Sequence, residues 1–400
     1  MSRLDELIEK LCPNGVELKK LREVSYMQRG TSLTKAKAVD GDIPVISGGK
    51  EPAFYCNSSN RDGETITVAG SGAGAGYVQY WNIPIFANDC FTVKGNEFTE
   101  TKYLYYFMTN IQDKISDTKK GGGVPHVHIF DVENFSLPVP PLEVQREIVH
   151  ILDSFTLLTA ELTAELTARK KQYEFYRDKL LTFGNDTLEC RLKDICDIFL
   201  GLTATPNYTD AGVKFISAQN TSNDFLDLSN VKYISETDFE NATSNAKPQR
   251  GDLLFTRVGS NLGHPVIVET DEKLCIFVSL GYLRVRNKKQ VVIGYLKHWM
   301  NTDLFWSQVR KNVHGAAKVN LNTGWLKEFR ISLPPLETQE RIVHVLDNFE
   351  AICTDLNIGL PAEIEARQKQ YEYYRDLLLT FAETGSTLMT DRQTDRAERI

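Results

Sequence analysis

The sequence predicts an α+β protein in which two similar domains, each a mostly antiparallel sheet with helices, are joined by two long helices. Three observations support this fold class. One long segment occurs twice, both copies carry an apolar stripe of helical period, and short runs of β-forming residues recur before each copy. We expect the long helices to pair as an antiparallel coiled coil, which gives the chain an approximate two-fold symmetry.

The repeat is clearest in two blocks of sixteen residues. PPLEVQREIVHILDSF at 140–155 returns as PPLETQERIVHVLDNF at 334–349, a shift of 194 residues (334 − 140). ARKKQYEFYRDKLLTF at 168–183 returns as ARQKQYEYYRDLLLTF at 366–381, a shift of 198 residues (366 − 168). The second copy therefore carries four extra residues between the blocks (198 − 194), which is about one helical turn.

Both copies are predicted to be helices from the spacing of their apolar residues. Steps of three, four or seven positions are typical of a helix that packs along its length against another helix. About forty residues at ~1.5 Å each extend roughly 60 Å, longer than a compact domain is wide, so an ordinary core helix is a poor explanation. The stripe of the first copy consists of Val144, Ile148, Ile151, Phe155, Leu162, Leu166, Tyr173, Tyr176, Leu180 and Phe183.

From Phe155 onward the stripe fits the heptad seam of a coiled coil, with Thr159 and Arg169 as its polar members. Gly359 and Pro361 in the second copy predict a break there rather than a smooth helix. The second copy continues the seam at Leu360, Ile364, Tyr371, Tyr374, Leu378 and Phe381, and Arg367 stands where Arg169 does.

The domain boundaries follow from these repeats. Residues 20–24 (KLREV) resemble residues 191–195 (RLKDI), and Gly30 matches Gly201 by the same shift of 171 residues (191 − 20). The predicted order is an N-terminal helix that completes the helical bundle at 1–16, a first domain at 17–140, the first long helix at 141–183, a second domain at 184–334, the second long helix at 335–381 and a polar tail at 382–400.

Each domain contains matching β-forming runs. IPVIS at 43–47 parallels VKFIS at 213–217, and ETITVAGSG at 64–72 parallels DLLFTRVGSN at 252–261. Such short runs of β-branched and aromatic residues between Gly, Asn and Asp are typical of a twisted antiparallel sheet. A third pair of runs is IFANDCFTVK at 85–94 and CIFVSLGYLRVR at 275–286. The other matches are a helix at 103–110 and 295–302, and a polar, glycine-bearing loop at 121–128 and 314–322.

Composition narrows the class of protein. A hydrophobic content of 42% with a mean hydropathy of −0.30 is typical of a soluble globular protein. No apolar run approaches the length of a membrane span and the N-terminus is no signal peptide, so a cytoplasmic location is expected. Seven scattered cysteines without a C-x-x-C pair argue against disulfides or zinc. A net charge of −7 gives no global nucleic-acid signature, so only local basic clusters can bind DNA.

The sequence offers no catalytic constellation. Residues 70–76 (GSGAGAG) are followed by a predicted strand rather than by the helix that a nucleotide loop needs, which favours a tight turn or a close backbone approach to a ligand. His126 and His128 share one face of an extended segment without a third metal ligand nearby. The Asn-Pro-Pro-Tyr/Phe tetrapeptide of adenine methyltransferases is absent. We predict no catalytic, cofactor-binding or metal-binding residue in this chain.

Basic and amide side chains do gather on loops at matching places in the two domains. Arg and Lys neutralise phosphates, while Arg, Asn and His can also read base edges. Taken one at a time, about half of these residues are explained as ordinary solvent-exposed surface charge. Their recurrence on the same loop in both domains favours a binding surface. The DNA-binding candidates are Lys119, Lys120, His126, His128, Arg257, Asn261, His264, Arg310, Lys311, His314, Lys318, Asn320 and Asn322.

With both repeats in view, the chain resembles the specificity subunit of a type I restriction-modification system. The resemblance covers nearly everything from Leu4 to Phe381 and rests on LCPNGVELKKL, both PPLE-x-Q-x-x-IVH-x-LD-x-F segments and both QYE-x-YRD-x-LLTF segments. Two Thr-Ala-Glu-Leu units at 159–162 and 163–166 further resemble the tandem spacer repeat of one subgroup. The second helix (TDLNIGLPAEI) lacks these units.

The resemblance implies that each domain is a target-recognition domain that reads one half of a split, asymmetric DNA site, while the helices set the unread spacer. It implies two methyltransferase subunits, which carry S-adenosylmethionine, and leaves room for two motor/nuclease subunits that use ATP and Mg. The chain itself would be non-catalytic. Candidate subunit-interface and spacer positions on the helices are Phe155, Leu162, Leu166, Arg169, Tyr173, Tyr176, Phe349, Arg367, Tyr371 and Tyr374.

Two other functions fit parts of the pattern. A stand-alone DNA adenine methyltransferase would bind S-adenosylmethionine as an isolated chain. A coiled-coil adaptor without DNA would not explain why two sheet domains share a scaffold and differ in their polar loops.

Overall fold

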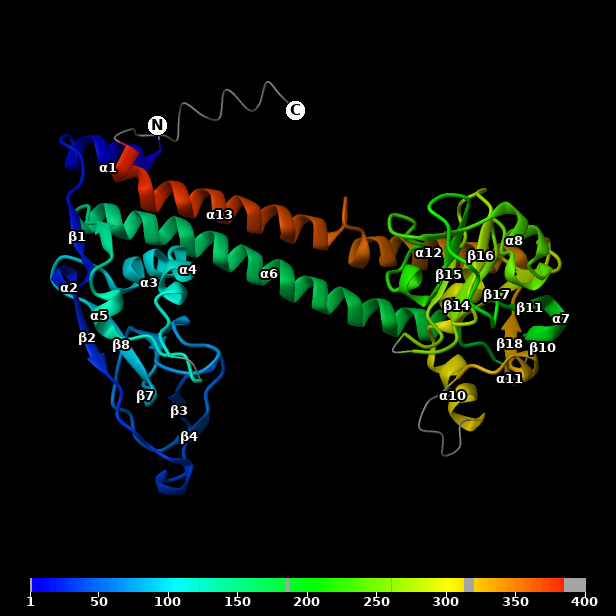
Figure 1. Cartoon of the computed structure of the whole chain (residues 1–400), viewed down its shortest axis with the longest axis horizontal. Helices are drawn as coiled ribbons and strands as arrows, with labels where there is room; N and C mark the ends of the chain where they lie inside the picture. Colours follow the sequence, from blue (N-terminus) through cyan, green and yellow to red (C-terminus); the bar gives the residue numbers. More distant parts are fainter. Residues whose placement is uncertain (1, 122, 185–186, 260, 313–319, 385–400) are drawn as a thin grey trace. The chain divides into compact units, whose positions relative to one another are not determined.

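The computed structural model describes residues 2–121, 123–184, 187–259, 261–312 and 320–384 (Figure 1). Its contacts divide the chain into two compact units. The first unit comprises Met1–Glu161 with Glu365–Ile400, and the second comprises Leu162–Ile364. Helices α6 (Leu142–Leu180) and α13 (Leu360–Thr384) each contribute residues to both units. Within the described residues, no helix has the length and apolar character to cross a membrane.

The first unit holds the first domain. Its four-stranded sheet has the order β2-β8-β5-β6, a three-stranded sheet has the order β4-β3-β7, and β1 pairs with β9. Its elements are α1 (Arg3–Leu11), β1 (Leu18–Lys20), α2 (Leu21–Val24), β2 (Ser25–Arg29), η1 (Lys35–Lys37), β3 (Ile43–Ile46), β4 (Phe54–Cys56), β5 (Thr65–Ala69), β6 (Val78–Trp81), β7 (Phe86–Ala87), β8 (Cys90–Gly95), α3 (Thr101–Asn110), α4 (Gln112–Asp117), α5 (Ile129–Val132), β9 (Ser136–Pro138) and parts of α6 and α13.

The second unit repeats this arrangement with sheets β11-β17-β14-β15, β13-β12-β16 and β10-β18. Besides parts of α6 and α13, its elements are β10 (Leu188–Arg191), α7 (Leu192–Ile195), β11 (Cys196–Leu200), β12 (Val213–Ile216), η2 (Ala218–Thr221), β13 (Lys232–Ile234), α8 (Glu236–Asn241), η3 (Ser244–Ala246), β14 (Leu253–Thr256), β15 (Pro265–Ile267), β16 (Leu274–Ile276), β17 (Leu280–Val285), α9 (Ile293–Met300), α10 (Asp303–Asn312), α11 (Thr323–Glu328), β18 (Arg330–Leu333) and α12 (Leu336–Thr354).

The two domains therefore share one topology, and the predicted fold class is confirmed. Among the described strand pairs, β3–β7 and β12–β16 are parallel and the others are antiparallel. All residues of β5 and β14 are buried because each strand lies inside its sheet and carries β-branched or apolar side chains. The predicted N-terminal helix is α1, and its Leu4 and Ile8 share one core cluster with Leu378 of α13.

Within each unit, the long repeats meet through an aromatic pair. In the first unit, Phe155 of α6 stacks on Tyr374 of α13 with ring centroids 5.4 Å apart. In the second unit, Tyr176 of α6 lies 6.1 Å from Phe349 of α12. These are the same two repeat positions with the helices exchanged, since Phe155 corresponds to Phe349 and Tyr176 to Tyr374.

The helix pair of the second unit is antiparallel. Tyr176 of α6 meets Phe349, whereas Lys170, further back along α6, lies close enough to Cys353 to influence its thiol electrostatically. The predicted break also exists, because α12 ends at Thr354 and α13 begins at Leu360. In the connection, the Asp355 carboxylate accepts hydrogen bonds from the backbone N–H groups of residues 357 and 358.

Glycine is required at the matching positions 30 and 201. A Cβ atom on Gly30 would lie 2.2 Å from the Asn88 carbonyl oxygen, and one on Gly201 would lie 2.2 Å from the Phe277 carbonyl oxygen.

We expect Gly201→Ala to lower the free energy of unfolding of the second unit by roughly 1–3 kcal/mol, because two backbone segments must separate. Chemical denaturation checks this. The control is Gly184→Ala, whose Cβ would meet nothing within 4 Å. Equal stability of the two variants would contradict the prediction.

Candidate nucleic-acid interface

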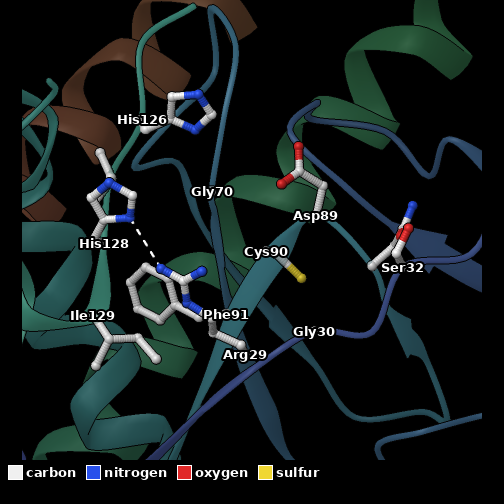
Figure 2. A pocket seen from close by; sticks show the side chains of 12 residues that line it. Arg29, Gly30, Ser32, Gly70, Asp89, Cys90, Phe91, His126, His128 and Ile129 are labelled. Carbon is white, nitrogen blue, oxygen red and sulfur yellow. Dashed lines mark hydrogen bonds between the residues drawn. The ribbon is translucent and has the colours of Figure 1, made fainter. Parts of the chain in front are cut away.

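In the first domain, the ends of several strands surround a shallow cavity of about 290 Å³ (Figure 2). Arg29 ends β2, Gly70 follows β5, and His126 and His128 lie on the segment that enters α5. These residues are distant in sequence and meet because β2, β5 and β8 are neighbours in one sheet. The cavity is lined by Arg29, Gly30, Ser32, Gly70, Asn88, Asp89, Cys90, Phe91, His126, Val127, His128 and Ile129.

The two histidines lie on either side of a buried valine. The Val127 backbone N–H donates to the Gly70 carbonyl oxygen at 3.1 Å, which ties the segment to the end of β5. The imidazole rings of His126 and His128 lie 6.0 Å apart with 5° between their planes, and the Phe130 ring continues the stack at 5.5 Å from His128. His126 and Phe130 are exposed. The structure therefore places the two predicted imidazoles together on one face.

Positive charge surrounds this stack. A terminal nitrogen of the Arg29 guanidinium lies 3.2 Å from His128 Nδ1 (Figure 2). Lys120 Nζ lies 4.7 Å from the Phe130 ring centroid and forms a 2.5 Å ion pair with Asp131, and Lys119 is exposed beside it. The acidic side chain of Asp89 also lines the cavity, and it accepts a hydrogen bond from Ser71 Oγ. The surface thus combines phosphate-binding groups with groups that can read bases.

The second domain has an equivalent segment. The Leu321 backbone N–H donates to the Arg257 carbonyl oxygen at 3.1 Å, just beyond β14, and Leu321 is buried. Asn320 and Asn322 on either side of it are exposed. Asn322 also caps α11, since its side-chain oxygen accepts from the Gly324 N–H at 2.7 Å. The candidates His314 and Lys318 lie outside the described residues.

Three other candidates of the second domain make hydrogen bonds within it. The half-buried Arg257 guanidinium donates to the carbonyl oxygens of Val278 and Leu321, at 3.2 and 3.3 Å, and burial lowers its pKa. Asn261 Nδ2 donates to the Ser222 carbonyl at 3.1 Å, and His264 Nε2 lies 2.9 Å from the Asn223 carbonyl oxygen. All three side chains therefore hold main chain in place.

The remaining basic candidates lie near the end of α10. Arg310 is exposed and forms a 2.5 Å ion pair with Asp303 of the same helix. Lys311 is exposed. A role in binding DNA stays a prediction for all the candidate residues.

The sequence interpretation missed Arg29 and the polar residues Ser32, Asn88 and Asp89, although all four line the cavity. A signal for Arg29 was present. It immediately precedes Gly30, which the repeat matched to Gly201, and a charged residue beside a glycine needed for close backbone approach is a reasonable candidate for a site.

The helix candidates divide between buried and exposed positions. Leu162 is buried, and Phe155, Leu166, Phe349, Tyr371 and Tyr374 are half-buried. Arg169 and Tyr176 are exposed, and Arg169 pairs with Glu165 on its own helix. Arg367 is half-buried and donates to Gln370.

Tyr173 belongs to a partly buried polar network in the second unit. Its hydroxyl lies 3.1 Å from His298 Nδ1, and His298 Nε2 lies 2.8 Å from Asp347 Oδ1. Glu350 nearby forms a 2.5 Å ion pair with Lys297. The cluster of His298, Asp347 and Glu350 has the ligand types of a metal site. Both ring nitrogens of His298 already have protein partners, so a hydrogen-bonded network is the better description.

This network should make stability depend on pH. Burial raises the pKa of Asp347, but the hydrogen bond from His298 and the charge of Lys297 outweigh it, so the net pKa is lowered. A lowered carboxyl pKa stabilises the fold above the unfolded pKa of about 4, and this contribution disappears as the pH falls through the folded pKa. We expect Asp347→Asn to cost about 0.5 kcal/mol near pH 7, because solvent screens a 54% exposed carboxylate, and to cost less near pH 3.

Urea denaturation at the two pH values, followed by tryptophan fluorescence, measures this difference. The control is Asp271→Asn, which removes an exposed carboxylate paired with Arg250. A cost of Asp347→Asn that is the same at both pH values would show that its charge plays no part.

The family model of the type I restriction modification DNA specificity domain matches residues 13–169 and again residues 185–366. Two matches that together span most of the chain decide its family. The chain belongs to the type I DNA specificity subunits. This also supports the prediction that it is a non-catalytic subunit of its complex.

Individual relatives agree. The chain is 30% identical over 398 residues to the type I specificity subunit S.HindORF215P of Haemophilus influenzae, covering 94% of this chain and 98% of that one. It is 31% identical over 298 residues to the EcoR124I/EcoR124II specificity subunit of Escherichia coli, covering 71% of each. The subgroup with Thr-Ala-Glu-Leu units stays a prediction.

Solved structures share the fold of this specificity subunit. The S subunit of the type I system of M. genitalium matches 92% of this chain and 97% of its own, with a TM-score of 0.56 at 14% identity. A chain from a study of complex assembly in the type I R-M system matches 92% of this chain and 98% of its own, with a TM-score of 0.61 at 20% identity.

Proposed function

We propose that this specificity subunit directs a type I restriction-modification complex to a bipartite, asymmetric DNA site, of which each domain reads one half. The observation that carries this proposal is the equivalence of the two loop sites. One scaffold presents His126 and His128 in the first domain and Asn320 and Asn322 in the second, each pair beside an arginine. Equal scaffolds with unlike polar side chains fit two readers of unlike sequence.

The long helices would set the spacer between the half-sites and dock the partner subunits. We expect two methyltransferase subunits, which bring S-adenosylmethionine. Two motor/nuclease subunits that use ATP and Mg are compatible with this assembly. A net charge of −7 is compatible with DNA binding in such a complex, because partner subunits can supply phosphate contacts.

The proposal is tested by producing the chain with its methyltransferase subunit in a host without other modification and sequencing the modified bases. We expect a two-part motif that disappears without the chain. Loss or exchange of one domain should change one half of the motif only. A motif that is independent of the chain, or one that survives loss of either domain, would overturn the proposal.

A calorimetric titration of the isolated chain with S-adenosylmethionine distinguishes the proposed function from that of a stand-alone methyltransferase. The proposal predicts no binding by the isolated chain, whereas a stand-alone methyltransferase would bind the cofactor.

A further inference from the structure

Residues 126–128 and 320–322, here called the reading segments, occupy the same place in the two domains. Residue 126 forms an antiparallel bridge with Ser71, and residue 320 forms one with Val258. The middle residues, Val127 and Leu321, are buried at 2% and 0% exposure. Each middle residue donates its backbone N–H to the carbonyl of the residue just after a central strand. The main chain of each reading segment is therefore bonded to the end of a central strand of its domain.

The side chains on either side of the buried residue differ between the domains. They are both histidine in the first domain and both asparagine in the second. Both residue types can donate and accept hydrogen bonds, and both suit base edges. Since a functional side chain is best positioned when its main chain is bonded to the sheet, these four positions are suited to distinguish bases.

Each reading segment is supported by one arginine, but from a different strand. In the first domain Arg29, at the end of β2, contacts the His128 side chain. In the second domain Arg257, beyond β14, donates to the Leu321 main-chain carbonyl. The register of the sheets places Leu200 at the position of Arg29 and Gly70 at that of Arg257. Both domains thus place an arginine against the reading segment, on different strands and with different partners.

The Arg29 contact also defines the chemistry of His128. A guanidinium can only donate hydrogen bonds, so His128 Nδ1 must accept in this contact. With Nδ1 as the acceptor, the imidazole carries its N–H on Nε2. In this state His128 offers a donor, which matches an acceptor on a base edge such as N7 or O6 of guanine or O4 of thymine.

We propose that His126, His128, Asn320 and Asn322 are the specificity-determining positions of the two half-sites, and that Arg29 is a positioning residue that makes His128 a hydrogen-bond donor. This inference rests on the proposed function and assigns it to particular side chains. Arg257 positions the second reading segment through its main chain.

The test uses the complex of the chain with its methyltransferase subunit and reads modified bases in genomic DNA. His126→Ala and His128→Ala should relax one or more base positions in one half-site, with about tenfold weaker discrimination at each, and leave the other half-site unchanged. Asn320→Ala and Asn322→Asp should do the reverse. Aspartate at 322 keeps the acceptor that caps α11 and loses only the side-chain donor.

Two further variants test the role of Arg29. Arg29→Ala should relax the same base position as His128→Ala. His128→Gln should keep the wild-type preference, because its side-chain nitrogen still donates near the place of Nε2. Thermal unfolding and binding to the methyltransferase subunit should match the wild type for every variant, which separates base reading from a role in stability.

Each remaining result has a clear meaning. An unchanged motif in all the single variants would overturn the assignment, although the proposed function would stand if the motif still required the chain. Equal relaxation of both half-sites by a first-domain variant would also overturn it. Loss of all modification by a stably folded variant would show a general contribution to binding and contradict a role in specificity. Absence of a chain-dependent motif with the wild type would instead refute the proposed function.

Discussion

Replacing Gln145 with alanine is expected to destabilise the first unit by about 3–5 kcal/mol. Gln145 is fully buried near the start of α6. Its side-chain oxygen accepts from the Glu100 N–H at 2.9 Å, and its nitrogen donates to the Phe98 and Pro140 carbonyl oxygens at 2.8 and 2.7 Å. Alanine would leave three main-chain groups without partners, at about 1–3 kcal/mol for each one that stays buried.

Gln339 provides an internal replicate. It is fully buried in the second unit and makes the same three contacts, to the Val292 N–H and to the Gln290 and Pro334 carbonyl oxygens. Hydrogen exchange followed by mass spectrometry should show lost protection in the first unit for Gln145→Ala and in the second for Gln339→Ala. The exposed Gln368 is the control, and Gln368→Ala should change stability by less than about 0.5 kcal/mol. If Gln145→Ala or Gln339→Ala changed stability as little as Gln368→Ala, the prediction would be wrong.

Inserting one Thr-Ala-Glu-Leu unit after residue 166 is expected to lengthen the spacer of the recognised DNA site. The existing units lie inside α6, so four more helical residues add ~6 Å to its length. This is close to two base-pair rises of ~3.4 Å. The two half-sites should stay the same, because neither reading segment is altered. Sequencing of modified bases with the complete complex measures both features at once.

The matched control changes composition without length. Thr163→Ala with Glu165→Ala alters one unit at exposed positions of α6 and should leave the spacer unchanged. If the insertion variant still modifies DNA sites that have the original spacer, the length of α6 does not set the spacer and the prediction is wrong. Loss of modification at every spacer length, with the partner subunit still bound, would refute it as well.

The fold was predictable because its signals are local. The apolar period predicted the helices that became α6, α12 and α13, and Gly359 with Pro361 predicted the interruption between the last two. The β-forming runs marked the core strands β3 and β5 in the first domain and β12 and β14 in the second. The candidate site was only partly predictable. His126, His128, Asn320 and Asn322 were selected because they recur on matching loops, and the structure places them at equivalent positions.

Tertiary partners were not predictable from the same signals. Arg29 and His128 are 99 residues apart in the chain. They meet because β2 and β5 are both neighbours of β8, and because Val127 is bonded to Gly70 at the end of β5. Arg257 was selected for its charge, yet its guanidinium binds main-chain carbonyls. Gln145 recurs as Gln339 in the repeated PPLE-x-Q segment, but the repeat does not show that the side chain is buried or which main-chain groups it bonds.

The sequence by itself determined a duplicated architecture with two sheet domains and two long helices, because repeats, apolar periods and turn residues are local features of neighbouring positions. Only the tertiary structure decided which polar side chains face outward and which satisfy buried main chain. That division depends on which distant segments meet, since a buried hydrogen-bonding group must find its partner wherever the fold places one.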